Sequence, residues 1–134
     1  MEANYEPSEM DIIFYGLQSF NSSNTGGSKP RYVFLTVRDS ENTIVGGLIG
    51  KTYVAWLYVQ ALWLPENLRG QGYGRSLMLA AEKEALDRGC GDAWLDTFSF
   101  QALPFYTKLG YRVFAELPNF PPGGAKYFLT KSLR

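Results

Sequence analysis

Residues 68–74 read Leu-Arg-Gly-Gln-Gly-Tyr-Gly and carry three glycines at alternate positions. The segment lies between an apolar run and an amphipathic helical pattern. Glycine admits positive φ and close approach of the backbone, so successive N–H groups and the positive end of the following helix can converge on an anion. Arg69 adds a guanidinium that suits phosphate. The stretch therefore predicts a strand-to-helix junction that holds a phosphate group.

The spacing of the glycines decides which kind of phosphate loop this is. A dinucleotide-binding Gly-x-Gly-x-x-Gly would place its last glycine at Arg75 or Leu77, and no Gly-Lys-Ser/Thr follows as in a P-loop. The segment instead resembles the Gln/Arg-x-x-Gly-x-Gly/Ala pyrophosphate loop of the GNAT family of N-acetyltransferases, matched by Arg69, Gly72 and Gly74.

A second stretch strengthens this resemblance. Residues 95–98, Leu-Asp-Thr-Phe, are followed by residues 105–111, Phe-Tyr-Thr-Lys-Leu-Gly-Tyr, which look like the second signature of the same family. With the apolar strand before the loop, the resemblance covers roughly residues 44–133. It implies an α/β fold with a mixed, mostly antiparallel sheet flanked by helices, and a splayed pair of strands at the acyl-CoA site.

Composition limits the alternatives. The 134 residues are 46% hydrophobic and 16% aromatic, which suits one globular domain over residues 1–134. Thirteen basic residues balance thirteen acidic ones, so the charge favours neither nucleic acid nor a membrane surface as a partner. The apolar runs are shorter than the roughly 20 residues that span a bilayer. The single Cys90 and the lack of a secretory pattern at Met1 predict a cytoplasmic protein.

The chain contains no histidine. This removes the commonest general base, the commonest zinc ligand and every Ser-His or Cys-His nucleophilic pair. Hydrolase and zinc-enzyme functions are therefore disfavoured, and we expect no metal.

Periodicity predicts the order helix, three strands, helix, strand, helix, two strands. Ser8 and Asp11 suggest the start of a first helix near residues 8–20, and a loop follows at 21–30. The third strand, residues 55–64, is so apolar that we expect it to be covered on both faces. The remaining elements are expected at 31–38, 43–53, 74–88, 92–98, 101–109, 111–116 and 126–132. Relatives usually open with an extra strand, for which only residues 1–7 remain.

The resemblance implies acetyl-CoA as cosubstrate. Its pyrophosphate would meet the loop and the start of the helix, at Arg69, Gly70, Gln71, Gly72, Tyr73, Gly74, Arg75 and Ser76. The backbone of Leu62, Trp63 and Leu64 would pair with the pantetheine arm and polarise the thioester carbonyl. Ser99 stands where many relatives carry an asparagine that faces the cofactor.

The resemblance assigns Tyr106 as the general acid that protonates the departing thiolate, against the alternative of a buried structural aromatic. The base is less well marked. Many relatives carry a carboxylate where this chain has Gln60, which cannot accept a proton. Tyr58 would share the face of Gln60 by two-residue periodicity, and either could order a water molecule. Asp96 is the remaining carboxylate candidate, with a structural hydrogen-bond acceptor as its alternative.

The sequence thus predicts transfer of an acetyl group, by direct attack in a ternary complex, to a primary amine of a small molecule or a protein. Two alternatives stay open: a non-catalytic acyl-CoA-binding module, and an O-acyltransferase. Five aromatic residues could line the acceptor cleft but are expected to fill the core instead: Tyr53, Trp56, Tyr58, Phe100 and Phe120. Exposed strand edges and the short N-terminus favour a homodimer.

Overall fold

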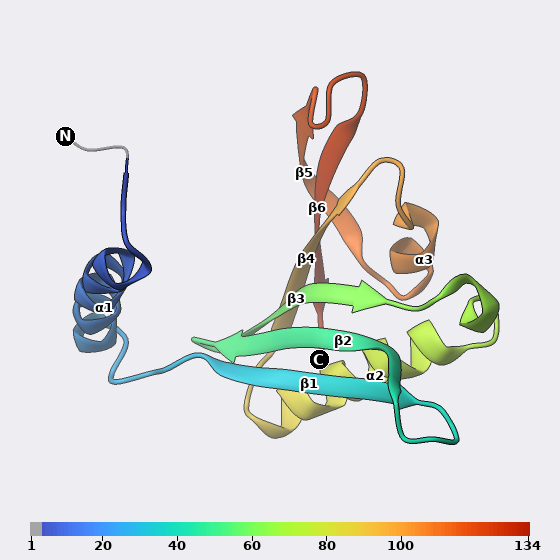
Figure 1. The fold of residues 1–134 in the computed structure, drawn as a ribbon, viewed down its shortest axis with the longest axis horizontal. Coiled ribbons are helices and arrows are strands. Elements are labelled where there is room, and N and C mark those ends of the chain that lie inside the picture. Colours follow the sequence, from blue (N-terminus) through green and yellow to red (C-terminus); the bar gives the residue numbers. More distant parts are fainter. Residues whose placement is uncertain (1–3) are drawn as a thin grey trace.

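A computed structural model describes residues 4–134 and shows one six-stranded sheet with three α-helices (Figure 1). The strand order is β1-β2-β3-β4-β6-β5, and every neighbouring pair is antiparallel except β3 with β4. The elements are α1 (Pro7–Asn24), β1 (Arg31–Arg38), β2 (Ile44–Tyr53), β3 (Trp56–Trp63), the 3-10 turn η1 (Glu66–Leu68), α2 (Tyr73–Asp87), β4 (Asp92–Phe98), α3 (Leu103–Lys108), β5 (Arg112–Pro118) and β6 (Ala125–Ser132).

The predicted order of helices and strands is confirmed, as is the α/β fold with a mixed, mostly antiparallel sheet. The described residues before α1 contain no strand, so in residues 4–134 the sheet begins with β1. Within the same part of the chain, no helix is long and apolar enough to cross a membrane.

The main core lies between α2 and one face of the sheet. Leu77, Met78, Ala81 and Ala85 form the buried side of the helix, and the largest buried strand residues are Leu48, Leu57, Leu95 and Leu129. This spacing at i, i+1, i+4 and i+8 is that of an amphipathic helix on a sheet. Gly89 follows α2 with φ +87°, the left-handed conformation in which glycine commonly ends a helix.

Glu82 departs from the usual amphipathic pattern of a surface helix, in which charged residues face solvent. The residue is buried, and its carboxylate accepts hydrogen bonds from the Tyr111 hydroxyl at 3.0 Å and the Lys131 ammonium at 2.7 Å. These two partners compensate the cost of burying the charge. Burial and the Glu82 charge together raise the pKa of Tyr111.

Helix α1 begins and ends differently from the expectation. Its N-cap is Glu6, which forms a capping box with Glu9, so Ser8 and Asp11 are not the capping pair. The helix continues to Asn24, where the sequence predicted a loop from residue 21. It buries none of its residues and stands apart from the sheet (Figure 1).

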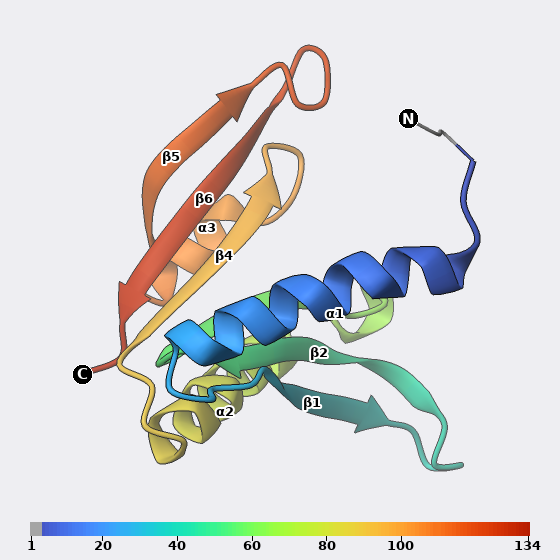
Figure 2. The same ribbon diagram turned by 90° about the vertical axis from the view of Figure 1, so that its left-hand side faces the viewer.

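The expectation that the third strand is covered on both faces is wrong for this chain. Leu57 and Val59 are buried, whereas Trp56 and Trp63 are exposed on the other side. The cause is that α2 and α3 both lie behind the sheet when it is viewed from the side of α1 (Figure 2). Phe100 and Phe120 are exposed too, so these aromatic residues do not fill the core.

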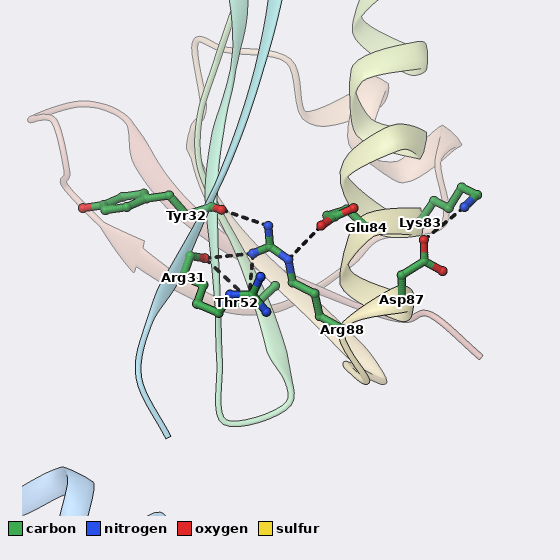
Figure 3. A network of polar contacts seen from close by, with 7 residues as sticks. All are labelled: Arg31, Tyr32, Thr52, Lys83, Glu84, Asp87 and Arg88. Atoms are coloured by element: carbon green, nitrogen blue, oxygen red, sulfur yellow. Dashed lines mark hydrogen bonds and ion pairs between the residues drawn. The ribbon is translucent and has the colours of Figure 1, made fainter. Parts of the chain in front are cut away.

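Arg88 links the end of α2 to the first hairpin (Figure 3). Its Nη1 donates to the Arg31 carbonyl and the Thr52 hydroxyl, both at 3.1 Å, and its Nη2 donates to the Tyr32 carbonyl at 3.0 Å. Its Nε contacts Glu84 at 3.0 Å. The guanidinium thereby holds β1 and β2 against the helix whose other end adjoins the glycine loop.

Arg88→Met keeps the apolar stem but leaves these strand carbonyls without a charged donor. We expect the free energy of unfolding to fall by about 1.5–3 kcal/mol, measured by urea denaturation. Lys83→Met is the matched control, because the Lys83–Asp87 pair lies on the same helix with a lysine side chain that is 78% exposed. It should change stability by less than about 0.5 kcal/mol. Equal losses in the two variants would contradict the role of Arg88.

Candidate active site

The loop that joins β3 to α2 needs glycine for two different reasons. Gly70 and Gly72 have φ of +73° and +89°, a region that side-chain-bearing residues adopt only with strain. Gly74 has no such φ, but a Cβ there would lie 3.2 Å from the ring of Phe105. Its glycine lets the start of α2 approach α3. The predicted strand-to-helix junction is therefore present, with η1 between β3 and the loop.

The amides at the start of α2 point out of the helix. The first intrahelical bond runs from the Ser76 N–H to the Gly72 carbonyl at 3.0 Å, so the Ser76 amide is already used. By helix geometry the N–H groups of Tyr73, Gly74 and Arg75 have no partner within the helix. They and the helix dipole can receive an anion.

Two side chains of the loop brace it from within. Nε of Arg69 donates to the Leu64 carbonyl at 2.9 Å, which ties the loop to the end of β3. The side-chain amide of Gln71 donates a hydrogen bond to the Asn67 carbonyl at 2.7 Å and so stabilises the loop. The bond of Arg69 involves only Nε and leaves the two terminal nitrogens of the guanidinium for a ligand.

Strands β3 and β4 separate next to this loop. They pair in parallel from Trp56 with Asp92 as far as Val59 with Leu95. Beyond that point β3 pairs only with β2, and β4 pairs only with β6. Figure 1 shows the two strands diverging from a common start. The expected splayed pair is therefore present.

A cleft of about 450 Å³ lies at the mouth of the splay. The end of β3, the loop, the start of α2 and α3 all line it, through Leu62, Leu64, Arg69, Gly70, Gly72, Gly74, Arg75, Ala102, Phe105 and Tyr106. The cleft thus brings together residues from both stretches that the sequence singled out. The sequence assigns no role to Ala102, and it marks Phe105 only as the first residue of the 105–111 segment; the contribution of both depends on how α3 packs.

Tyr106 reaches this cleft from α3. Its ring packs edge-on against Phe105 and Tyr111, with centroids 5.1 and 6.2 Å apart. Burial and, to a smaller extent, the charge of Asp96 raise the pKa of the Tyr106 phenol. The hydroxyl therefore keeps its proton at neutral pH and can donate it.

Some residues named from the sequence lie outside the cleft lining. The side chain of Trp63 lines a separate groove beside Phe34 on the opposite face. The Ser99 hydroxyl accepts a hydrogen bond from the Ala125 N–H at 3.0 Å and so holds the turn after β4. The side chains of Gln71, Tyr73 and Ser76 do not line the cleft either. For the loop residues, a contact with an anion would come from the backbone.

The face opposite the cleft carries a polar pair. The Tyr58 hydroxyl donates to Asp96 at 3.1 Å across the splay, and Lys126 lies 3.3 Å from the other carboxylate oxygen of Asp96. The Tyr58 ring stacks on Trp94 with centroids 4.1 Å apart. Burial, followed by the neighbouring Asp96, raises the pKa of Tyr58.

Gln60 does not simply follow the two-residue alternation from Tyr58. From Val59 to Ala61, strand β3 advances by two residues while its partner β2 advances by only one. Gln60 is the extra residue of this β-bulge and is exposed. A bulge bends its strand and re-aims side chains, which turns the end of β3 away from β4.

Lys126 is a residue of this site that the sequence analysis missed. Its ammonium lies 5.1 Å from the ring centroid of Phe98, 5.0 Å from that of Phe120 and 6.0 Å from that of Phe128. These distances allow cation–π attraction. The only sequence signal is a lysine in a strand rich in aromatic residues. Its contact with the rings can be recognised only from the strand register, which pairs Lys126 with Phe98.

Comparison with known proteins agrees with this geometry. The model of the acetyltransferase (GNAT) family matches residues 3–111. The chain belongs to this family. It is 38% identical over 115 residues to an acetyltransferase of Agrobacterium fabrum, covering 86% of this chain and 84% of that protein. It is 37% identical over 108 residues to blasticidin-S acetyltransferase of Streptomyces morookaense, covering 79% of each.

A crystal structure of an acetyltransferase from Agrobacterium tumefaciens matches this GNAT protein with a TM-score of 0.91 and 34% identity. The match covers 98% of this chain and 96% of that one. The family and the close likeness of the fold establish the chain as an acyltransferase of the GNAT type.

Cys90 takes no part in the GNAT cleft. The thiol is buried beyond the end of α2, and burial raises its pKa. A protonated thiol away from the cleft is a poor nucleophile, which disfavours an acyl-cysteine intermediate. Among residues 4–134, no three His, Cys, Asp or Glu side chains gather as a set of metal ligands.

Gly72→Val tests the phosphate loop. We expect acetyl-CoA affinity to fall about tenfold or more by calorimetry, because the loop must leave the conformation that aims its amides at an anion. Gly89→Val is the matched control. Gly89 has φ +87°, so a side chain there should cause the same backbone strain as at Gly72, and an added Cβ meets no neighbouring atom at either position. The control should lose similar stability but keep its affinity. Equal affinity in the two variants would contradict the assigned loop.

Proposed function

We propose that this chain transfers the acetyl group of acetyl-CoA to a primary amine by direct attack in a ternary complex. The observation that carries the proposal is the single cleft in which the glycine loop, the end of β3 and Tyr106 meet. These are the parts that acyl transfer needs: an anion site for the cofactor, donors for the oxyanion and an acid for the leaving group.

The pyrophosphate of acetyl-CoA would bind at the amides of residues 70–75. Arg69 and Arg75 both line the cleft and supply positive charge beside those amides. The pantetheine arm would then extend along β3, whose edge toward β4 has no strand partner after Val59. Backbone N–H groups of residues 62–64 would pair with the arm as with an added strand and polarise the thioester carbonyl.

Tyr106 would protonate the thiolate as the tetrahedral intermediate collapses. The C–S bond breaks, its electron pair goes to sulfur, and the phenol proton joins that sulfur to give the CoA thiol. A phenol and an alkyl thiol have similar acidities, so the transfer costs little. The raised pKa of Tyr106 is compatible with this role, because the phenol keeps the proton that it has to donate throughout the neutral range.

The amine would approach from the Tyr58 and Asp96 side of the splay. The Tyr58 hydroxyl already donates to Asp96, so its oxygen can accept a hydrogen bond from the amine or from a water that Gln60 helps to order, and it can take up the amine proton only as its own proton passes to Asp96. Asp96 would receive the proton or stabilise the positive charge that develops. Its contacts with Tyr58 and Lys126 use one lone pair on each oxygen and leave others available.

A small-molecule amine is the acceptor that we favour over a protein amino group. The support is the 37% identity with blasticidin-S acetyltransferase over 79% of this chain. A groove over β3, β4, β5 and β6, distinct from the groove beside Phe34, also offers aromatic surfaces, Trp56 and Trp94, that suit a flat molecule. We place the reaction in the cytoplasm, where acetyl-CoA is formed and used.

The acceptor class is tested by following CoA thiol release with blasticidin S, simple polyamines, lysine-containing peptides and hydroxyl analogues. We expect saturable turnover with at least one small amine and rates at the uncatalysed background with the alcohols. Saturation with peptides alone would assign a protein acceptor. Saturation with alcohols alone would contradict N-acetylation.

Tyr106→Phe should lower kcat by about a hundredfold while acetyl-CoA affinity is retained, since only the proton donor is lost. In the unmodified protein, the raised pKa keeps the phenol protonated throughout the neutral range, so ionisation of Tyr106 should not reduce kcat there. The measurement is kcat against pH for both proteins. A descending limb near pH 8 that disappears in Tyr106→Phe would contradict the raised pKa.

A further inference from the structure

Helix α1 presents an apolar stripe that its own chain does not cover. Met10, Ile13, Phe14, Leu17 and Phe20 recur at helical spacing on one side, and Ile13 is 74% exposed. An isolated helix of this length is marginal in water, so its stability must come from packing. A contiguous apolar surface of this kind marks an interaction site.

The sheet has an uncovered face on the same side of the molecule. On β1, Tyr32 and Phe34 are 67% and 62% exposed, and Trp63 on β3 is 59% exposed. Phe34 and Trp63 line a common groove with Ile49 on the face opposite α2. Parallel strand pairs such as β3 with β4 are normally covered on both faces, yet here the helices cover one. Figure 2 looks onto this open face, with α1 in front of it.

The connection after α1 holds the helix away from its own sheet (Figure 1). The Gly27 N–H donates to the Ser22 carbonyl at 2.9 Å, and Gly26 and Gly27 have φ of +66° and +83°. The Agrobacterium tumefaciens structure matches 98% of this chain with a TM-score of 0.91. A helix of 18 residues placed elsewhere would not allow a match of that quality, so the projecting position is shared.

We infer that a second copy of this chain occupies the open face, and that the two copies exchange their α1 helices. Each copy has one apolar helix stripe and one open apolar sheet face. In a two-fold dimer the stripe of each copy packs on the sheet face of the other, so all four surfaces are buried. The exchange also accounts for the apolar pattern of β3, which predicted a strand covered on both faces. The inference goes beyond acetyl transfer, and cofactor binding does not depend on it.

The test compares full-length variants by sedimentation equilibrium. The helix variant, Ile13→Glu with Leu17→Glu, places two charges on the stripe. The sheet variant, Tyr32→Glu with Phe34→Glu, places two charges on the open face. All four side chains are exposed within one copy, so neither variant disturbs its own core. The matched control, Gln18→Glu with Ser22→Glu, adds the same charges at the same spacing on a side of α1 outside the stripe.

We expect the unmodified chain and the control to sediment as dimers of 15.1 kDa subunits. The helix variant and the sheet variant should each weaken dimerisation by about a hundredfold or more and sediment as monomers. Circular dichroism and acetyl-CoA affinity should be unchanged, which separates loss of the dimer from loss of the fold or of the proposed cofactor site.

Mixing the two variants identifies the exchange itself. The intact helix of the sheet variant can bind the intact face of the helix variant, so the mixture should form a heterodimer through one of the two contacts. An unmodified chain that is monomeric at all concentrations would overturn the inference. So would a sheet variant that remains dimeric while the helix variant does not, because the two α1 helices would then pair with each other.

Discussion

The early end of the β3–β4 pairing is the constraint on which the site depends. Four residue pairs hold the two halves of the sheet together, and the pairing stops at Val59 and Leu95. Each strand keeps its outer neighbour, so the separation costs only the hydrogen bonds between the two inner edges. The bulge at Gln60 turns β3 away at this point. An unpaired strand edge in the middle of a sheet is a place where an extended ligand can take the role of the missing strand.

The same separation brings the chemical groups together from distant parts of the chain. Strand β3 leads through η1 into the glycine loop and α2, while β4 leads into α3 and Tyr106. The side of the sheet that carries the cleft therefore receives the glycine loop and Tyr106, and the opposite face receives Tyr58 and Asp96. The two sides are close enough for the Asp96 charge to contribute to the raised pKa of Tyr106. Lys126 offsets part of that charge at 3.3 Å, which allows a carboxylate to lie among aromatic rings.

Local patterns explain why so much of this structure could be predicted from the sequence. The glycine loop, the strand before it and the helix after it depend on neighbours within a few residues, and their positions are confirmed. Glu82, Gln60 and Lys126 could not be placed in the same way. Glu82 can be buried because Tyr111, just before β5, and Lys131, on β6, approach it from remote parts of the chain. The bulge at Gln60 and the aromatic surroundings of Lys126 follow from strand register, which no local pattern specifies.

The apolar pattern of β3 points to a different kind of limit. Burial on both faces would account for the sequence of residues 55–64, but one chain buries only one face. The same is true of α1, whose periodicity is that of a packed helix although residues 4–134 bury none of its side chains. Hydrophobic patterns reflect every surface that is buried in the working protein, including surfaces between copies. Two unsatisfied patterns on the same side of one molecule are therefore better explained by one shared interface than by two independent exceptions.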